Sequence, residues 1–108
     1  MPRAIYIGVF AKNEQPTTKI YSAFAEAVEN SKYFDFSRAS LDSTDEKKIR
    51  EAKVIVIEGD VPSQTISALS SLWGKKAVIV LREDSGMFSP RDLETMKKNL
   101  TWFLDELS

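Results

Sequence analysis

The sequence contains no histidine and no cysteine. Histidine is the commonest general base and metal ligand in proteins, so its absence excludes Ser-His-Asp and Cys-His mechanisms. The absence of cysteine excludes disulfides, thiolate nucleophiles and cysteine metal sites. Any catalysis must therefore depend on carboxylates, tyrosine, lysine, serine or threonine, and we expect neither a metal site nor a bound cofactor.

An excess of charge of either sign is also missing. The chain has 15 basic and 16 acidic residues and a net charge of -1. Nucleic-acid binders normally carry a basic face, so this balance argues against such a partner. No apolar stretch approaches the roughly 20 residues of a membrane span, and the N-terminus lacks a signal pattern. We therefore expect a soluble cytoplasmic protein with no membrane partner.

The 108 residues, of which 43% are hydrophobic, are enough for one domain with its own core, spanning residues 1–108. Two apolar runs, residues 53–57 and 77–81, flank a short helical stretch that opens at Pro62 and closes near Trp73. Near-continuous apolar strands around a helix are typical of a parallel sheet that is covered on both faces.

The rest of the chain repeats this alternation of strand and helix. Strands are expected at residues 4–10 and, as a short edge strand, at 33–36. Helices are expected from Pro16 to about Asn30, over residues 45–52, and after Ser89 and Pro90, which suit the cap and first turn of a helix. With right-handed crossovers, the pattern predicts a flavodoxin-like three-layer α/β/α sandwich with a four-stranded parallel sheet of order 2-1-3-4. The first and last helices should share one face.

Polar residues gather where these strands are expected to end. Ligands of open α/β sheets bind beyond the carboxyl ends of the strands. The loops that follow the first and third strands supply the candidates Lys12, Glu58, Gly59, Asp60 and Ser63. Paired carboxylates can perform acid/base or glycosyl chemistry, but loops are also polar simply because they are solvated.

Ser63 follows Pro62 at the start of a helix. Unpaired backbone N–H groups and the helix dipole favour an anion there, so Ser63 is a candidate phosphate contact. Serine at this position is more commonly a helix cap, and the two roles can coexist.

Several segments, in this order and spacing, resemble the nucleoside 2-deoxyribosyltransferase-like superfamily. The segments cover about three quarters of the chain and are Ile5-Tyr6-Ile7-Gly8; Asp45 followed by Ile49, Ala52, Val54 and Val56; Pro62-Ser63; and Gly74-Lys75-Lys76-Ala77-Val78. The resemblance implies cleavage or transfer at the N-glycosidic bond of a nucleoside or nucleotide. It also implies that Tyr6 and Asp45 support the reaction and that Ser63 contacts a phosphate.

The sequence departs from that family at two functional positions. Ile66 stands near the position of the family's nucleophilic glutamate, and residues 64–73 contain no acidic side chain. Val9-Phe10 replaces a small-residue turn after the first strand. Losing a covalent nucleophile commonly costs several powers of ten in rate. Glu58 or Asp60 are the acids that remain at the strand ends, so N-glycosidic chemistry should be weak or lost.

Two functions therefore remain open. The first is a divergent nucleoside deoxyribosyltransferase-like domain that binds a nucleoside, nucleotide or sugar phosphate, with Tyr6, Asp45, Glu58 and Asp60 as candidate catalytic residues. Its ligand contacts would be Gly8, Phe10, Lys12, Gly59 and Ser63. The second is a non-enzymatic, homo-oligomeric sensing or interaction module. The final helix favours self-association, because Trp102 lies opposite its apolar stripe, and a homodimer with Trp102 near the contact is expected.

Overall fold

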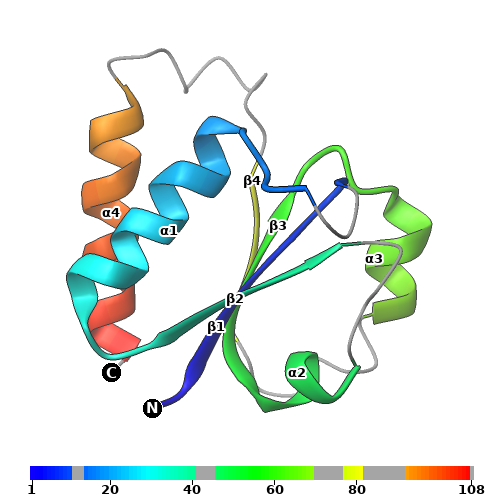
Figure 1. Cartoon of the computed structure of the whole chain (residues 1–108), viewed down its shortest axis with the longest axis horizontal. Helices are drawn as coiled ribbons and strands as arrows, with labels where there is room; N and C mark the ends of the chain where they lie inside the picture. The colour runs from blue at the N-terminus through cyan, green and yellow to red at the C-terminus, as the bar shows by residue number, and fades with distance from the viewer. Residues whose placement is uncertain (11–13, 41–45, 70–76, 82–91, 108) are drawn as a thin grey trace.

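The computed structural model describes residues 1–10, 14–40, 46–69, 77–81 and 92–107, in which strands and helices alternate (Figure 1). The elements are β1 (Arg3–Gly8), α1 (Lys19–Ser31), β2 (Asp35–Ser40), α2 (Glu46–Glu51), β3 (Ala52–Glu58), α3 (Ser63–Leu69), β4 (Ala77–Leu81) and α4 (Asp92–Leu107). The predicted order of elements is confirmed.

All four strands run parallel in one sheet, in the order β2-β1-β3-β4. The predicted flavodoxin-like topology is therefore confirmed. The register aligns Tyr6 of β1 with Arg38 of β2 on one side and with Val56 of β3 on the other. Since the chain leaves β1 toward β2 but later returns to β3 on the opposite side, the strand order reverses between β1 and β3.

Alternate strand residues face two separate apolar layers. Ala4, Tyr6, Val54 and Val56 contribute to the layer that lies beneath α1 and α4. Ile5, Ile7, Ile55 and Ile57 contribute to the layer that Ile49 of α2 and Ile66 of α3 cover from the other side. The predicted pairing of the first and last helices on one face is thus confirmed.

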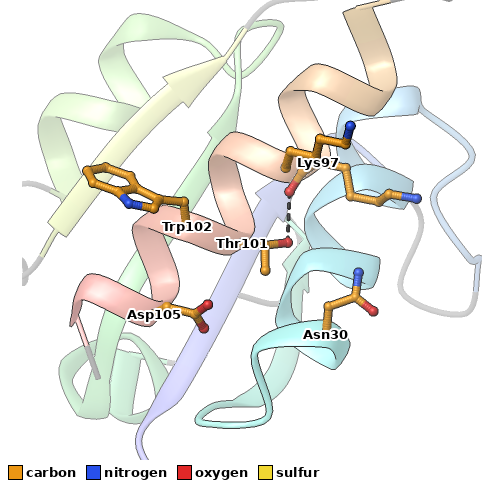
Figure 2. A pocket seen from close by; sticks show the side chains of 6 residues that line it. Asn30, Lys97, Thr101, Trp102 and Asp105 are labelled. Atoms are coloured by element: carbon orange, nitrogen blue, oxygen red, sulfur yellow. Dashed lines mark hydrogen bonds between the residues drawn. The ribbon is translucent and has the colours of Figure 1, made fainter.

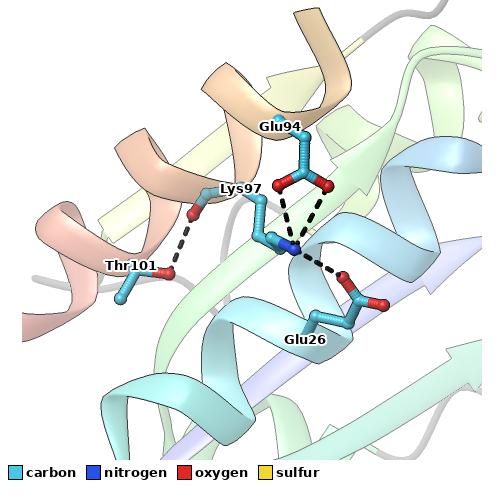
Figure 3. Close-up of polar contacts among 4 residues, drawn as sticks. All are labelled: Glu26, Glu94, Lys97 and Thr101. Carbon is cyan, nitrogen blue, oxygen red and sulfur yellow. Dashed lines mark hydrogen bonds and ion pairs between the residues drawn. The ribbon is translucent and has the colours of Figure 1, made fainter. Parts of the chain in front are cut away.

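Helices α1 and α4 pack side by side (Figure 1). Met96, Leu100 and Leu104 of α4 are buried, as its apolar periodicity predicts. At the rim of this contact, the Lys97 ammonium lies 3.3 Å from Glu26 of α1 and 3.2 Å from Glu94 of α4 (Figure 3). Solvent screens such exposed ion pairs and they add little stability, so the helices are held mainly by their apolar contact.

The boundaries of α1 and β2 differ from the expectation. Helix α1 begins at Lys19, because the Thr18 side chain accepts a hydrogen bond from the Tyr21 N–H and caps the helix, and buried Pro16 precedes it. Strand β2 runs to Ser40 rather than ending at Phe36, because pairing with β1 extends over the full length of that strand. Strand β1 itself ends at Gly8 and leaves Phe10 outside the sheet.

Strand β4 is less buried than its apolar run suggests. It lies at an edge of the sheet, its residues are half-buried, and the Val80 side chain is 46% exposed. Edge position removes one neighbouring strand, so an apolar sequence alone does not give full burial. The expected cap at Ser89 and Pro90 lies outside the described residues, and no helix within the described ranges is long and apolar enough to cross a membrane.

Candidate functional site

Tyr6 and Glu58 meet at the carboxyl ends of β1 and β3. The Tyr6 hydroxyl donates a hydrogen bond of 2.9 Å to the Glu58 Oε1 atom. Both residues are buried, with exposed fractions of 1% and 5%. They share the face of the sheet that α1 and α4 cover, because Tyr6 aligns with Val56 and Glu58 follows two residues later. Tyr6 and Glu58, which the sequence nominated separately, therefore contact each other at the point where the strand order reverses.

Thr18 is a third member of this cluster, and the sequence analysis did not nominate it. Its hydroxyl donates to the same Oε1 atom of Glu58 and accepts the Tyr21 N–H at 3.1 Å. The carboxylate is thereby linked to the N-terminus of α1, where the helix dipole favours negative charge. A threonine immediately before an amphipathic stretch is an N-cap signal that could have identified the residue.

Gly8 allows the tyrosine to reach the carboxylate. Glu58 lies two residues beyond the residue aligned with Tyr6, about 7 Å farther along the sheet. The Tyr6 ring must therefore lean forward over Gly8, and a Cβ added there would lie 2.5 Å from the Tyr6 hydroxyl oxygen and 2.8 Å from the ring. Gly8, expected to contact a ligand, thus has a packing role beneath Tyr6.

Aromatic rings surround Tyr6. The Phe10 ring stacks on Tyr6 with centroids 6.2 Å apart, and Tyr21 of α1 meets Tyr6 edge-on at 4.9 Å. The Arg38 guanidinium carbon of β2 lies 5.8 Å from the centroid of the Phe10 ring. No local motif in the sequence distinguishes Arg38, and only the pairing of β2 with β1 brings it to this edge.

Burial raises the pKa of the Tyr6 phenol above its ordinary value, and the negative charges of Glu58 and Asp60 add to this shift. Both causes disfavour the phenolate, the first because a charged oxygen loses its hydration and the second because like charges repel. Tyr6 is therefore a hydrogen-bond donor, not a base, over the range in which proteins normally work.

The remaining nominated residues are placed differently. The Gly59 N–H donates to the Leu81 carbonyl at 2.6 Å and so continues the pairing of β3 with β4. Asp60 is exposed beyond the end of β3. Lys12 and Asp45 lie outside the described residues.

Ser63 is the first residue of α3 and is exposed. The carbonyl that accepts the first helical hydrogen bonds belongs to Pro62, which receives the N–H groups of Thr65 and Ile66 at 3.0 and 3.1 Å. Helix α3 covers the face of the sheet opposite to Tyr6 and Glu58. The structure therefore does not bring Ser63 into their cluster, and its phosphate contact stays a prediction.

A separate shallow hollow of about 340 Å³ lies on the outer side of α1 and α4 (Figure 2). Its lining residues are Asn30, Lys97, Lys98, Thr101, Trp102 and Asp105. Asn30 lies near the C-terminal end of α1, whereas Thr18 of the Tyr6 cluster lies at the other end. The hollow and the cluster are therefore different places on the molecule. Within the described ranges, no group of three or more acidic side chains is arranged to hold a metal ion.

No family model and no curated protein sequence matches the chain. Among solved structures, a flavodoxin from the domain Archaea is similar, with a TM-score of 0.63 over 97% of this chain and 98% of its own at 10% identity. A diflavin flavoprotein A3 from Nostoc sp. gives a TM-score of 0.49 over 94% of this chain and 73% of its own at 18% identity. The first likeness establishes the flavodoxin-like fold.

Replacing Gly8 by alanine should destabilise the protein by about 1–3 kcal/mol, because the new methyl group must displace the Tyr6 ring from its place over the strand. Chemical denaturation measures the change. In a Tyr6→Ala background the same substitution should have a clearly smaller effect, since the obstructing ring is gone. Equal losses in both backgrounds would show that Gly8 is required for another reason.

Tyr6→Phe should lower the free energy of unfolding at neutral pH by about 1–3 kcal/mol, because the Glu58 carboxylate loses a donor. A raised pKa in the folded state gives stability that is complete below the unfolded tyrosine pKa of about 10 and is lost above it. The difference in the free energy of unfolding between the wild type and Tyr6→Phe should therefore shrink as the pH rises above about 10.

Denaturation curves between neutral and alkaline pH test this dependence. Tyr33→Phe is the matched control, because it removes a phenol hydroxyl from a side chain that is 52% exposed. A wild type and Tyr6→Phe variant with parallel pH profiles would contradict the role assigned to the buried phenol.

Proposed function

We propose that the protein binds a nucleoside- or nucleotide-like ligand at the carboxyl edge of the sheet between β1 and β3, with N-glycosidic chemistry that is weak or lost. The observation that carries the proposal is the buried Tyr6–Glu58 pair at the point where the strand order reverses. In open α/β folds this is the place where ligands bind. The family resemblance, which nominates Tyr6, leads to the same edge.

The position of Glu58 supports this reading over a purely structural one. Burying a carboxylate is costly unless hydrogen bonds satisfy it, and here two hydroxyls converge on Oε1. An apolar residue would fill this position in the core without such a cost. Val56, which lies two residues earlier on the same face of β3, is an example. A carboxylate oxygen set among hydroxyl donors suits recognition of sugar hydroxyls, which donate hydrogen bonds to carboxylates.

The proposal of weak or lost catalysis follows from Ile66. This side chain stands where the family resemblance implies a nucleophilic glutamate, and it packs against the apolar layer beneath α3. Glu58 is the buried acid at the edge, but the hydroxyls of Tyr6 and Thr18 stabilise its charge. A carboxylate whose charge is already stabilised is a weaker nucleophile.

The fold likeness raises flavin mononucleotide as an alternative, because flavodoxins hold this cofactor at the same reversal point. The phosphate of such a ligand would be favoured at a helix N-terminus. At the start of α1, however, the Thr18 hydroxyl already joins the helix to the Glu58 carboxylate. A phosphate dianion placed there would meet a buried negative charge, so these residues do not fit a flavin phosphate at that position.

Calorimetric or thermal-shift titration with deoxynucleosides, their monophosphates, ribose 5-phosphate and flavin mononucleotide tests the proposal. A ligand present at about 100 times its dissociation constant should stabilise the protein by about 2.7 kcal/mol, which raises the melting temperature measurably. Glu58→Gln should weaken the bound nucleoside by about tenfold or more, because a charge-assisted hydrogen bond is lost.

Glu51→Gln is the matched control, since Glu51 is exposed at the end of α2, just before β3 begins, and pairs with Arg3. Its ligand affinities should equal those of the wild type. Failure of every nucleoside and nucleotide to bind would contradict the proposal, and preferential binding of flavin mononucleotide would replace it. Release of base from deoxynucleoside monophosphates at about 1 per second or faster would show that catalysis is retained.

Self-association is a second proposed property, and the exposed Trp102 favours it. The side chain is 65% exposed and borders the hollow on α4 (Figure 2). Tryptophan is among the residues that most often anchor protein interfaces, because it buries a large area at one point. We propose a homodimer with Trp102 at or near the contact.

Light scattering of the wild type and of Trp102→Ala at tens of micromolar protein tests this contact. We expect a dimeric wild type and a monomeric or much weaker variant, because the anchor is removed. Tyr33→Ala removes a similarly exposed aromatic side chain elsewhere and should leave the mass unchanged. A monomeric wild type, or a dimer that Trp102→Ala does not weaken, would contradict the proposal.

A further inference from the structure

Arg38 lies on the same face of the sheet as Tyr6 and Glu58. It occupies β2, where the register sets it beside Tyr6, and its side chain is half-buried. The guanidinium carbon lies 5.8 Å from the centroid of Phe10, whose ring in turn stacks on Tyr6. Phe10 therefore lies between Tyr6 of β1 and the guanidinium of Arg38 of β2.

Arg38 has no carboxylate partner among the residues that the structure describes. Arg3 and Lys97, by contrast, form ion pairs with carboxylates at 3.2 to 3.7 Å. A guanidinium without a described carboxylate partner is available to pair with an anion from outside the chain. Here the aromatic face of Phe10 compensates the positive charge only in part, since a cation–π contact is worth about 0.5–2 kcal/mol.

The carbon of the Arg38 guanidinium lies over the ring of Phe10. The N–H groups lie in the plane of the group and form a fork that matches the oxygens of a phosphate. The planar fork of an arginine is also pre-organised, so less conformational entropy is lost for each hydrogen bond that it makes to an anion. Arg38 thus combines a place beside the ring of Phe10, N–H donors and a charge that no described carboxylate neutralises.

We infer that Arg38 binds the phosphate of a nucleoside monophosphate whose sugar lies toward Glu58, an inference that rests on the function proposed above. Arg38 and Val56 flank Tyr6 on neighbouring strands, about 10 Å apart across the sheet. The phosphate is thereby held on the β2 side, away from the Glu58 carboxylate that would repel it at the start of α1.

This assignment gives the phosphate a different partner from the one that the family resemblance implies. Ser63 opens α3 on the opposite face of the sheet, whereas Arg38 shares its face with Tyr6 and Glu58. A single ligand that lies over the Tyr6 face therefore has Arg38 as its nearer candidate partner for a phosphate.

Isothermal titration with a deoxynucleoside and its 5′-monophosphate, on the wild type and on Arg38→Gln, Arg38→Lys and Ser63→Ala, tests the inference. The wild type should bind the monophosphate at least about tenfold more tightly than the nucleoside, through charge-assisted hydrogen bonds. Arg38→Gln should abolish this preference and leave the nucleoside affinity within about twofold of wild type. Arg38→Lys should retain part of it, because lysine keeps the charge but not the fork. Ser63→Ala should bind both ligands as the wild type does.

The outcomes separate this inference from the proposed function. Equal affinity of the wild type for nucleoside and monophosphate would overturn the role of Arg38 while the proposed function stands. A preference that survives Arg38→Gln and disappears in Ser63→Ala would overturn it in favour of the α3 side. If neither ligand binds the wild type, the proposed function fails and the inference fails with it. Thermal denaturation of each variant confirms that its fold is retained.

Discussion

The carboxylate of Glu58 is the constraint on which the arrangement of this protein depends. It is buried at the end of a central strand, and the hydroxyls of Tyr6 and Thr18 converge on one of its oxygens. Those two residues come from β1 and from the cap of α1, so a single buried charge joins two strands and a helix. Such a charge is tolerated only where its donors are held in place, because losing a donor leaves a costly unsatisfied group. Gly8 belongs to the same constraint, since only a residue without a side chain lets the Tyr6 ring lean across the strand.

The two faces of the sheet have different chemical characters. The face beneath α2 and α3 is aliphatic, with isoleucines of β1 and β3 packed against Ile49 and Ile66. The face beneath α1 and α4 contains the aromatic rings, the buried carboxylate and a guanidinium beside the ring of Phe10. Because parallel strands place equivalent residues side by side, these groups gather at the carboxyl edge of one face. The sheet therefore has an aliphatic face on one side and a face with a polar, aromatic edge on the other.

The likeness to an archaeal flavodoxin concerns the fold, whereas the resemblance to deoxyribosyltransferases concerns short segments of sequence. The first is a likeness of fold, at 10% identity over nearly the whole of both chains. The second rests on short segments, and one of its central positions is the apolar Ile66. In open α/β sheets the place where ligands bind is a property of the strand order, which here reverses between β1 and β3. The chemistry of that edge then depends on the individual residues of this chain, because one fold supports many unrelated functions.

The sequence by itself determined the order of strands and helices, the parallel sheet, the strand order and the division of the helices between its faces. These follow from the period of the apolar residues and from the handedness of crossovers, which are local or general properties. It also nominated Tyr6 and Glu58, but not their contact, and it missed Thr18 and Arg38. Only the tertiary structure decided which of these residues meet. The register of β1 against β2 and β3 brings together residues that are far apart in the sequence, and Tyr6 and Glu58 are separated by 52 positions. Register depends on the packing of whole strands and helices, which no short segment of sequence contains.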